Sequence, residues 1–180
     1  FRTIGVGVVV VGPQRVLYGT HRSTAELFGE IYFQPTWDVH QDAAARDFLA
    51  QVVRQRAGED MLAADALEAL VRASGGVMRD LISLGRRAGE EAYRSAAPNV
   101  DRAAVERAAD ALGRALMLGL RPGELKLLKN LSSGGTFVPM TDDDLALLET
   151  RRVLEYRGAS VRYAVHPTIV PLLAAMKGAA

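Results

Sequence analysis

The sequence predicts a mainly helical protein with small β elements, and three observations support this prediction. Between residues 41 and 118, apolar residues recur at helical spacing in four segments joined by short connections, which predicts a four-helix bundle. After residue 119, short helical segments accompany a hairpin pattern, which predicts a winged-helix module. Before residue 41, a continuous β-branched run predicts the remnant of a parallel α/β sheet. We therefore expect three regions, 1–40, 41–118 and 119–180.

In the first region, Ile4 to Val11 is β-branched and ends at Gly12-Pro13, the pattern of a strand buried on both faces. Leu17 to Phe28 predicts a short helix, and Glu30 to Gln34 predicts a second short strand stopped by Pro35. Because such strands need neighbours, we expect these residues to be the last two strands of a sheet whose remainder precedes Phe1.

The second region contains four predicted helices, which begin near Asp42, near Met61, near Val77 and after the N-cap residues Asn99 and Asp101. Gly58 is placed to cap the first helix at its C-terminus. The apolar residues expected to face the core are, helix by helix, Phe48, Leu49, Val52 and Val53; Leu62, Leu67, Leu70 and Val71; Met78, Leu81, Ile82, Ala88 and Ala92; and Val105, Ala108, Leu112 and Leu116.

The third region begins with a short helix from Leu125 to Leu131, followed by a helix start at Thr141, where Asp142, Asp143 and Asp144 complement the helix dipole. The segments Val153 to Arg157 and Val161 to Val165 flank Gly158-Ala159-Ser160, which predicts a hairpin. A last helix is expected from Thr168 to Met176. Helices followed by a two-stranded wing predict the winged-helix module.

Composition excludes several classes of function. The formal net charge of +1 gives no general case for a nucleic-acid or membrane-surface partner. The absence of cysteine excludes disulfides and thiolate metal sites. The longest apolar run, Val8 to Val11, is far below the roughly 18 residues that a membrane span requires, and the charged-then-apolar pattern of a signal peptide does not occur in the sequence. We expect a cytoplasmic protein with no membrane partner.

The chain lacks the motifs of a complete active site. No glycine-rich loop ends in Gly-Lys-Ser/Thr, Gly5-Val6-Gly7 lacks the third glycine of a dinucleotide loop, and no histidine has a second metal ligand at suitable spacing. The most distinctive stretch is instead Ser74 to Leu81. Gly75 and Gly76 suit the left-handed residues that end a helix, and without a Cβ they admit a ligand or a partner domain.

Arg79 lies in the predicted first turn of the next helix, where a cation opposes the helix dipole by roughly 0.3–1 kcal/mol. Its position raises the question of which anion it meets. The alternative is an ordinary surface arginine paired with a neighbouring carboxylate.

Four short stretches stand out in this order of elements: Phe33-Gln34-Pro35, Arg46-Asp47-Phe48-Leu49, Arg54-Gln55-Arg56 and Gly75-Gly76-Val77-Met78-Arg79-Asp80-Leu81. With them, the order of elements resembles the C-terminal half of an AAA+ ATPase of the origin-recognition or STAND-like type. The resemblance implies the end of a nucleotide-binding domain, a helical lid and a winged helix. It also implies a missing N-terminal portion carrying the P-loop. The intact protein would bind ATP or ADP with Mg²⁺. This chain, without Walker A or Walker B, is expected to bind nucleotide weakly or not at all and to lack catalytic activity alone.

The resemblance also assigns roles to single residues. Arg79 would be the sensor-2 arginine, which reaches from the lid to the γ-phosphate, with Gly75 and Gly76 beside it. Arg22 would be an arginine finger that completes a neighbour's site, with Arg15 as its competitor. The usual polar sensor-1 residue is replaced by Gly12-Pro13-Gln14, which puts hydrolysis in doubt.

The winged-helix module gives mixed signals for DNA binding. Asp142, Asp143, Asp144 and Glu149 on the helix after Thr141 would repel phosphate, whereas Arg151, Arg152, Arg157 and Arg162 form a basic wing. These arginines are the candidates for contact with DNA or a partner, and DNA ranks behind a protein contact, self-association or an intramolecular role. Two other hypotheses remain open: a stand-alone winged-helix DNA-binding regulator that dimerises through its N-terminal part, and an interaction scaffold.

Overall fold

The computed structural model of the chain describes residues 7, 9–12, 18, 30–58 and 60–178. Within them, helices predominate and the two strands form an antiparallel pair, as the sequence predicts. The helices are α3 (Ala43–Ala57), α4 (Ala64–Ala73), α5 (Met78–Arg94), α6 (Arg102–Met117), α7 (Pro122–Ser132), α8 (Asp142–Glu149) and α9 (Val170–Gly178). The strands are β1 (Val153–Arg157) and β2 (Val161–Val165). None of these helices is long and apolar enough to cross a lipid bilayer.

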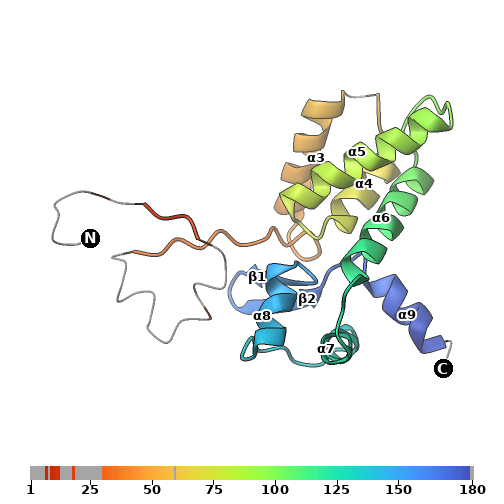
Figure 1. Ribbon diagram of the computed structural model, residues 1–180. Coiled ribbons are helices and arrows are strands. Elements are labelled where there is room, and N and C mark those ends of the chain that lie inside the picture. Colours follow the sequence, from red (N-terminus) through yellow and green to blue (C-terminus); the bar gives the residue numbers. More distant parts are fainter. Residues whose placement is uncertain (1–6, 8, 13–17, 19–29, 59, 179–180) are drawn as a thin grey trace.

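Helices α3 to α6 form a bundle, seen at the top of Figure 1. Its caps agree with the sequence: Asp42 accepts a hydrogen bond from the Ala44 amide, Asp101 accepts one from Ala104, and Gly58 ends α3 with φ of 83°. The side chains of its core are Val39, Leu49, Val53, Ala66, Leu67, Leu70, Val71, Leu81, Leu84, Ala88, Ala92, Val100, Ala104, Val105 and Ala108. We call helices α3 to α6 the bundle.

Two residues predicted to lie in this core are more exposed than expected. Phe48 is 43% exposed and packs on the Trp37 ring, with the centroids 4.9 Å apart. Met78, the first residue of α5, is 37% exposed. Periodicity places both residues on an apolar face, but it does not show how much of that face the neighbouring helices cover.

Helices α7, α8 and α9 surround the β1–β2 hairpin, and we call this part the C-terminal module. The strands pair from Val153 opposite Val165 to Arg157 opposite Val161. Thr141 and Asp144 form a reciprocal capping box at the start of α8. A second core holds this module together, made of Leu128, Phe137, Leu147, Leu148, Val153, Val165, Ile169 and Leu173.

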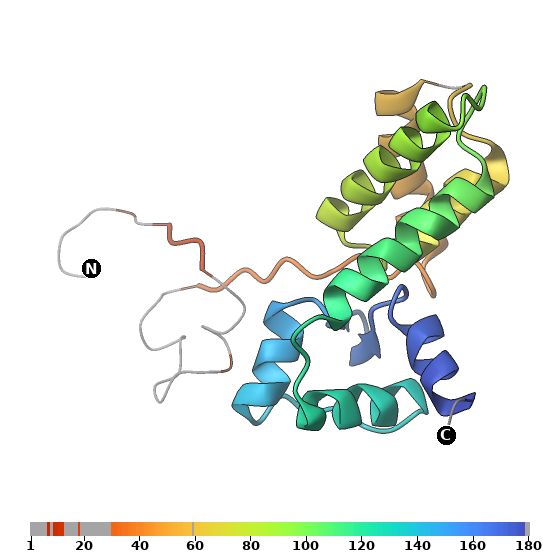
Figure 2. The same ribbon diagram turned by 45° about the vertical axis from the view of Figure 1, so that its right-hand side comes forward.

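Helix α6 leads from the bundle into the C-terminal module, and Figure 2 shows it running diagonally between them. Its last carbonyls are satisfied from the other module: Arg152 donates from Nε to the Leu116 carbonyl at 2.7 Å and from a terminal nitrogen to the Leu118 carbonyl at 2.6 Å. Gly113 of α6 lies so close to the Thr168 carbonyl that a Cβ would overlap it. The two modules therefore meet backbone against backbone.

The prediction of a parallel sheet before residue 41 is not met in the residues that the structure describes. Glu30 to Gln34 is not a strand, and neither is the segment 9–12. Val9, Val11 and Tyr32 are 93%, 96% and 89% exposed. The physical reason is that a parallel strand needs a neighbour for its hydrogen bonds, and the described chain supplies none there. Ile4 to Val6, Val8 and, apart from Tyr18, the helix predicted from Leu17 to Phe28 lie outside the described residues.

Candidate functional site

The turn between α4 and α5 has the conformation that its glycines predict. Gly75 has φ of 59° and Gly76 has φ of 83°, both in the left-handed region. The Ser74 hydroxyl donates to the Val71 carbonyl at 2.7 Å and accepts from the Gly76 amide at 3.1 Å. Tyr156 of β1 donates its hydroxyl to the Gly75 carbonyl at 2.8 Å. The turn is thus held by hydrogen bonds from both modules.

The space beside these glycines is occupied by the chain itself. A Cβ on Gly75 would lie 2.5 Å from Cδ1 of Leu154 and 2.9 Å from Cδ of Pro167, both in the C-terminal module. A Cβ on Gly76 would overlap the carbonyl oxygen of Trp37. The sequence allowed either a ligand or a partner domain to lie beside these glycines. In the structure, the space left by the absent side chains is filled by another part of this same chain.

Arg79 lies in the first turn of α5 and is exposed. Its guanidinium forms no ion pair with any residue in the described part of the chain. The carboxylate partner that the surface-pair alternative requires is not in contact with Arg79 among the described residues. Arg79 is therefore free to meet an anion that approaches this end of α5.

Asp80, the next residue, is buried and paired, in contrast to the exposed Arg79. It is only 2% exposed, and its carboxylate accepts two hydrogen bonds from Arg151 of the C-terminal module, at 3.0 Å from Nε and 3.2 Å from a terminal nitrogen. Such a bidentate pair is among the stronger and more directional contacts in proteins. It fixes the position of the C-terminal module relative to α5.

His166 completes this arrangement, and its Nε2 lies 3.6 Å from Oδ2 of Asp80. Its Nδ1 accepts from the Thr168 amide at 3.3 Å and lies 2.8 Å from the Thr168 hydroxyl. The neutral ring therefore carries its proton on Nε2, facing the carboxylate. Nε2 is buried, and its N–H faces the Asp80 carboxylate at 3.6 Å, a contact longer than an ordinary hydrogen bond, so Nε2 has no full hydrogen-bond partner. We call Asp80, Arg151, His166 and Thr168 the junction cluster.

Two other members of the junction cluster, His166 and Arg151, lower the pKa of Asp80. Burial by itself raises the pKa of this carboxyl, but the facing His166 and the Arg151 guanidinium outweigh burial and hold the net pKa below its usual value. Asp80 is therefore ionised at neutral pH, as the ion pair requires.

Arg151 follows α8 in a left-handed conformation, with φ of 58°, that a residue with a Cβ avoids at roughly 1–2 kcal/mol. This conformation ends the helix: the Arg151 amide donates to the Leu148 carbonyl at 3.0 Å and the Arg152 amide to the Leu147 carbonyl at 2.9 Å. The turn directs the Arg151 side chain, about one-third exposed, to the buried Asp80.

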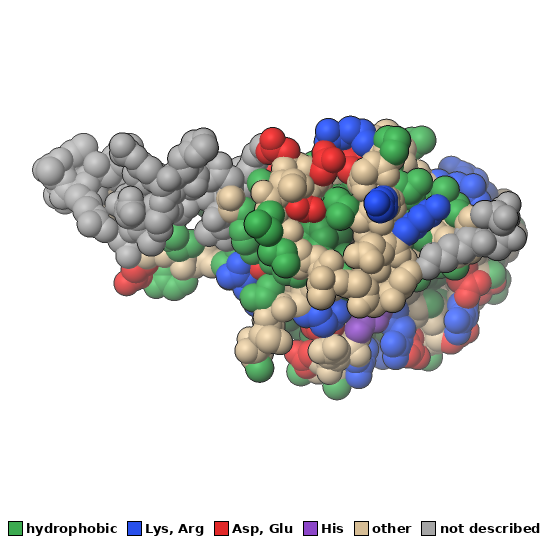
Figure 3. Space-filling view, turned by 90° about the horizontal axis from the view of Figure 1, so that it is seen from below, with side chains coloured by type: hydrophobic (Ala, Val, Ile, Leu, Met, Phe, Trp, Pro, Cys, Tyr) green, Lys and Arg blue, Asp and Glu red, His purple; other side chains and the backbone are tan. Residues whose placement is uncertain are grey.

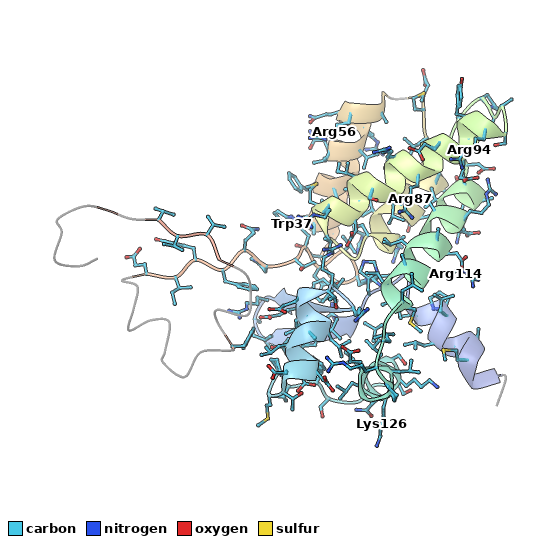
Figure 4. The ribbon with its side chains drawn as sticks, viewed as in Figure 1. Trp37, Arg56, Arg87, Arg94, Arg114 and Lys126 are labelled. Atoms are coloured by element: carbon cyan, nitrogen blue, oxygen red, sulfur yellow. The ribbon has the colours of Figure 1, made fainter. Side chains whose placement is uncertain are left out.

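Arg157 and Arg162 of the hairpin contact residues 30–38, which we call the strap. The Arg157 guanidinium lies 3.9 Å from the Phe33 ring centroid and pairs with Glu155 at 2.5 Å. Arg162 pairs with Asp38 of the strap at 2.6 Å. Figure 4 shows Trp37, also of the strap, at the base of the bundle. The strap therefore connects the bundle to the hairpin.

All four predicted wing arginines, Arg151, Arg152, Arg157 and Arg162, make intramolecular contacts. On the face shown in Figure 3, positive and negative side chains are interspersed and do not form one continuous basic surface. The intramolecular role, left open by the sequence, accounts for these contacts. Binding of the wing to DNA or a partner stays a prediction.

Sequence reasoning missed the residues that join the modules. His166 is isolated in the sequence but faces Asp80 in space, and Asp38 pairs with a residue 124 positions away. The one available signal was Asp80, a carboxylate beside an arginine in a helix's first turn. Arg22, the predicted arginine finger, and Arg15 lie outside the described residues. Within the described ranges, no three His, Asp or Glu side chains are grouped closely enough to hold a metal ion.

Comparison of the chain with known protein families, curated proteins and solved structures returns no match.

Proposed function

We propose that this chain is the lid and winged-helix region of an AAA+ or STAND-like P-loop ATPase, a regulatory part that senses nucleotide at α5 and contacts a partner through the C-terminal module. The observation that supports this proposal is the contrast between two adjacent residues. Arg79 is exposed and unpaired within the described residues, whereas Asp80 is buried in the junction cluster.

Arg79 has the properties that a phosphate sensor needs. Its guanidinium is permanently charged and its fork of N–H groups matches phosphate oxygens. The first turn of α5 adds the positive end of the helix dipole, so an anion there gains from both. An anion also removes the unfavourable interaction between Arg79 and that dipole. The ATP and Mg²⁺ would be held by the P-loop portion that the resemblance implies, since this chain has neither Walker motif.

The sensor and the module contact share one helical turn. A phosphate that pulls on Arg79 would also displace Asp80 and the Gly75-Gly76 turn, because the four residues lie within one short segment of backbone held by the hydrogen bonds of α5 and of the turn. Displacement of Asp80 acts on Arg151, and displacement of Gly75 acts on Leu154. Binding of a nucleotide at Arg79 would thereby change the position of the C-terminal module directly, with no further residues needed between them.

The first experiment is the mass of the native gene product, measured by immunoblot of the source cells. A band well above 19.4 kDa supports a longer ATPase, whereas a band at that mass favours the regulator or scaffold hypothesis.

The second experiment is Arg79→Ala in the full-length gene product, with Arg86→Ala as the matched control because Arg86 is an exposed arginine of the same helix that pairs with Glu90. Loss of a hydrogen-bonded charge contact, worth about 1.5–3 kcal/mol, predicts a reduction of roughly tenfold or more in ATP-dependent turnover or assembly. Arg86→Ala should behave like the parent. Unaltered turnover and unaltered ATP-driven assembly in Arg79→Ala would remove the assignment.

A further inference from the structure

We infer that the junction cluster is a releasable latch: the contact between Asp80 and Arg151, with His166 facing it, holds the C-terminal module on α5 in a docked state from which the module can detach. Only the trigger for release, nucleotide at Arg79, rests on the proposed function. The latch itself rests on the geometry of the described residues.

The modules have separate cores, which is the first step of the argument. The bundle core ends at Ala108 and the core of the C-terminal module begins at Leu128, and no buried side chain belongs to both. Between them, Gly75 packs on the side chains of Leu154 and Pro167, and Gly113 lies against the Thr168 backbone. The half-buried Leu116 and Met117 of α6 lie on the C-terminal core. Modules that have separate cores and share only such contacts are expected to move relative to each other.

A buried ion pair suits a releasable contact better than an apolar one. Two ions regain hydration when they separate, so the net stabilisation from a buried pair is small even though its geometry is strict. An apolar contact of the same size gains nothing comparable from water. Asp80 and Arg151 therefore orient the module precisely without holding it permanently.

The docked state also carries a local penalty that detachment removes. Nε2 of His166 is buried without a hydrogen-bond partner. Once the module leaves α5, water can solvate the His166 ring. A buried polar group left without a partner is a feature that calls for a functional explanation, and release of the module supplies one.

The test measures a distance across the junction in this chain. The sequence contains no cysteine, so Arg87→Cys on α5 and Lys126→Cys on α7 provide two exposed, unique sites for nitroxide labels, and Figure 4 shows these residues in different modules. Pulsed electron paramagnetic resonance then gives the distribution of label separations. The parent should show one dominant population.

Asp80→Asn keeps the shape of the side chain and removes its charge, and it should produce a several-fold rise in a second, displaced population. The matched control is Asp110→Asn, which removes a carboxylate from the exposed Asp110–Arg114 pair on α6 and should leave the distribution unchanged. If Asp80→Asn does not fold, Arg151→Lys decides, because lysine keeps the charge but cannot form the bidentate contact. A distribution identical to the parent's in the folded variant overturns the latch.

The latch and the proposed function fail in different experiments. The distance measurement contains no nucleotide, so an unchanged distribution leaves the Arg79→Ala result standing. Conversely, unaltered ATP turnover in Arg79→Ala leaves a displaced population in Asp80→Asn intact as evidence for a latch.

Discussion

Replacement of Gly76 by alanine separates backbone strain from crowding at the base of the bundle. Gly76 has φ of 83° and Gly134, in the loop after α7, has φ of 86°. Alanine at either position pays the left-handed penalty of roughly 1–2 kcal/mol. At Gly134 nothing lies within 4 Å of the new Cβ, whereas at Gly76 the Cβ overlaps the Trp37 carbonyl oxygen and lies 2.7 Å from the carbonyl carbon.

The crowding at Gly76 cannot be relieved by rotation of a side chain, because the obstructing atoms belong to the main chain of Trp37. The strap must move, and overpacking of this kind typically costs about 1–3 kcal/mol. The free energy of unfolding should therefore fall by about 1–3 kcal/mol more in Gly76→Ala than in Gly134→Ala.

Urea denaturation measures this difference, with Trp37 as the reporter. It is the single tryptophan of the chain, and its backbone lies directly against Gly76. Far-UV circular dichroism gives the unfolding of the helices in parallel. Equal losses of stability in Gly76→Ala and Gly134→Ala would refute the conclusion that the strap packs against this turn.

Three further substitutions test individual contacts. The folded-state pKa of Asp80 is below its usual value of 3.8, so its ionised form contributes stability that is present at neutral pH and is lost as the pH falls through the folded-state pKa; the stability gap between the parent and Asp80→Asn should narrow in urea titrations toward pH 3, and a constant gap would contradict the ion pair. Thr141→Ala removes the capping box of α8 and should cost about 1 kcal/mol in thermal melts, whereas Thr150→Ala, at the C-terminal end of the same helix, should be close to neutral. Arg151→Gly should be about 1 kcal/mol more stable than Arg151→Ala, because glycine adopts the backbone at φ of 58° without strain; equal stabilities would show that this backbone is unstrained.

The helices and the hairpin could be predicted because their signals are local. Asp42, Asp101 and Thr141 each accept a hydrogen bond from an amide two or three residues onward, and Gly58 ends its helix in a left-handed conformation. These contacts lie within a few positions in the sequence, so residue types and spacing are enough to place them.

The junction could not be predicted, because its partners are far apart in the sequence. Arg151 lies 71 positions from Asp80, and a charged residue in a pattern does not reveal which opposite charge it will meet. The strand at Glu30 to Gln34 failed for a related reason. A short run of apolar and aromatic residues such as Ile31, Tyr32 and Phe33 indicates a tendency to form a strand, but a strand forms only where another strand supplies hydrogen bonds.

Arg152 has a consequence for the reach of the C-terminal module. It donates to the Leu116 and Leu118 carbonyls, so the last turn of α6 is capped only while the module is docked. Detachment removes both donors at once, and the end of α6 becomes free to unwind. A helical residue rises 1.5 Å and an extended one about 3.4 Å, so unwinding one turn lengthens the tether by about 7 Å. The side chain that completes the helix in the docked state thus also determines how far the released module can travel.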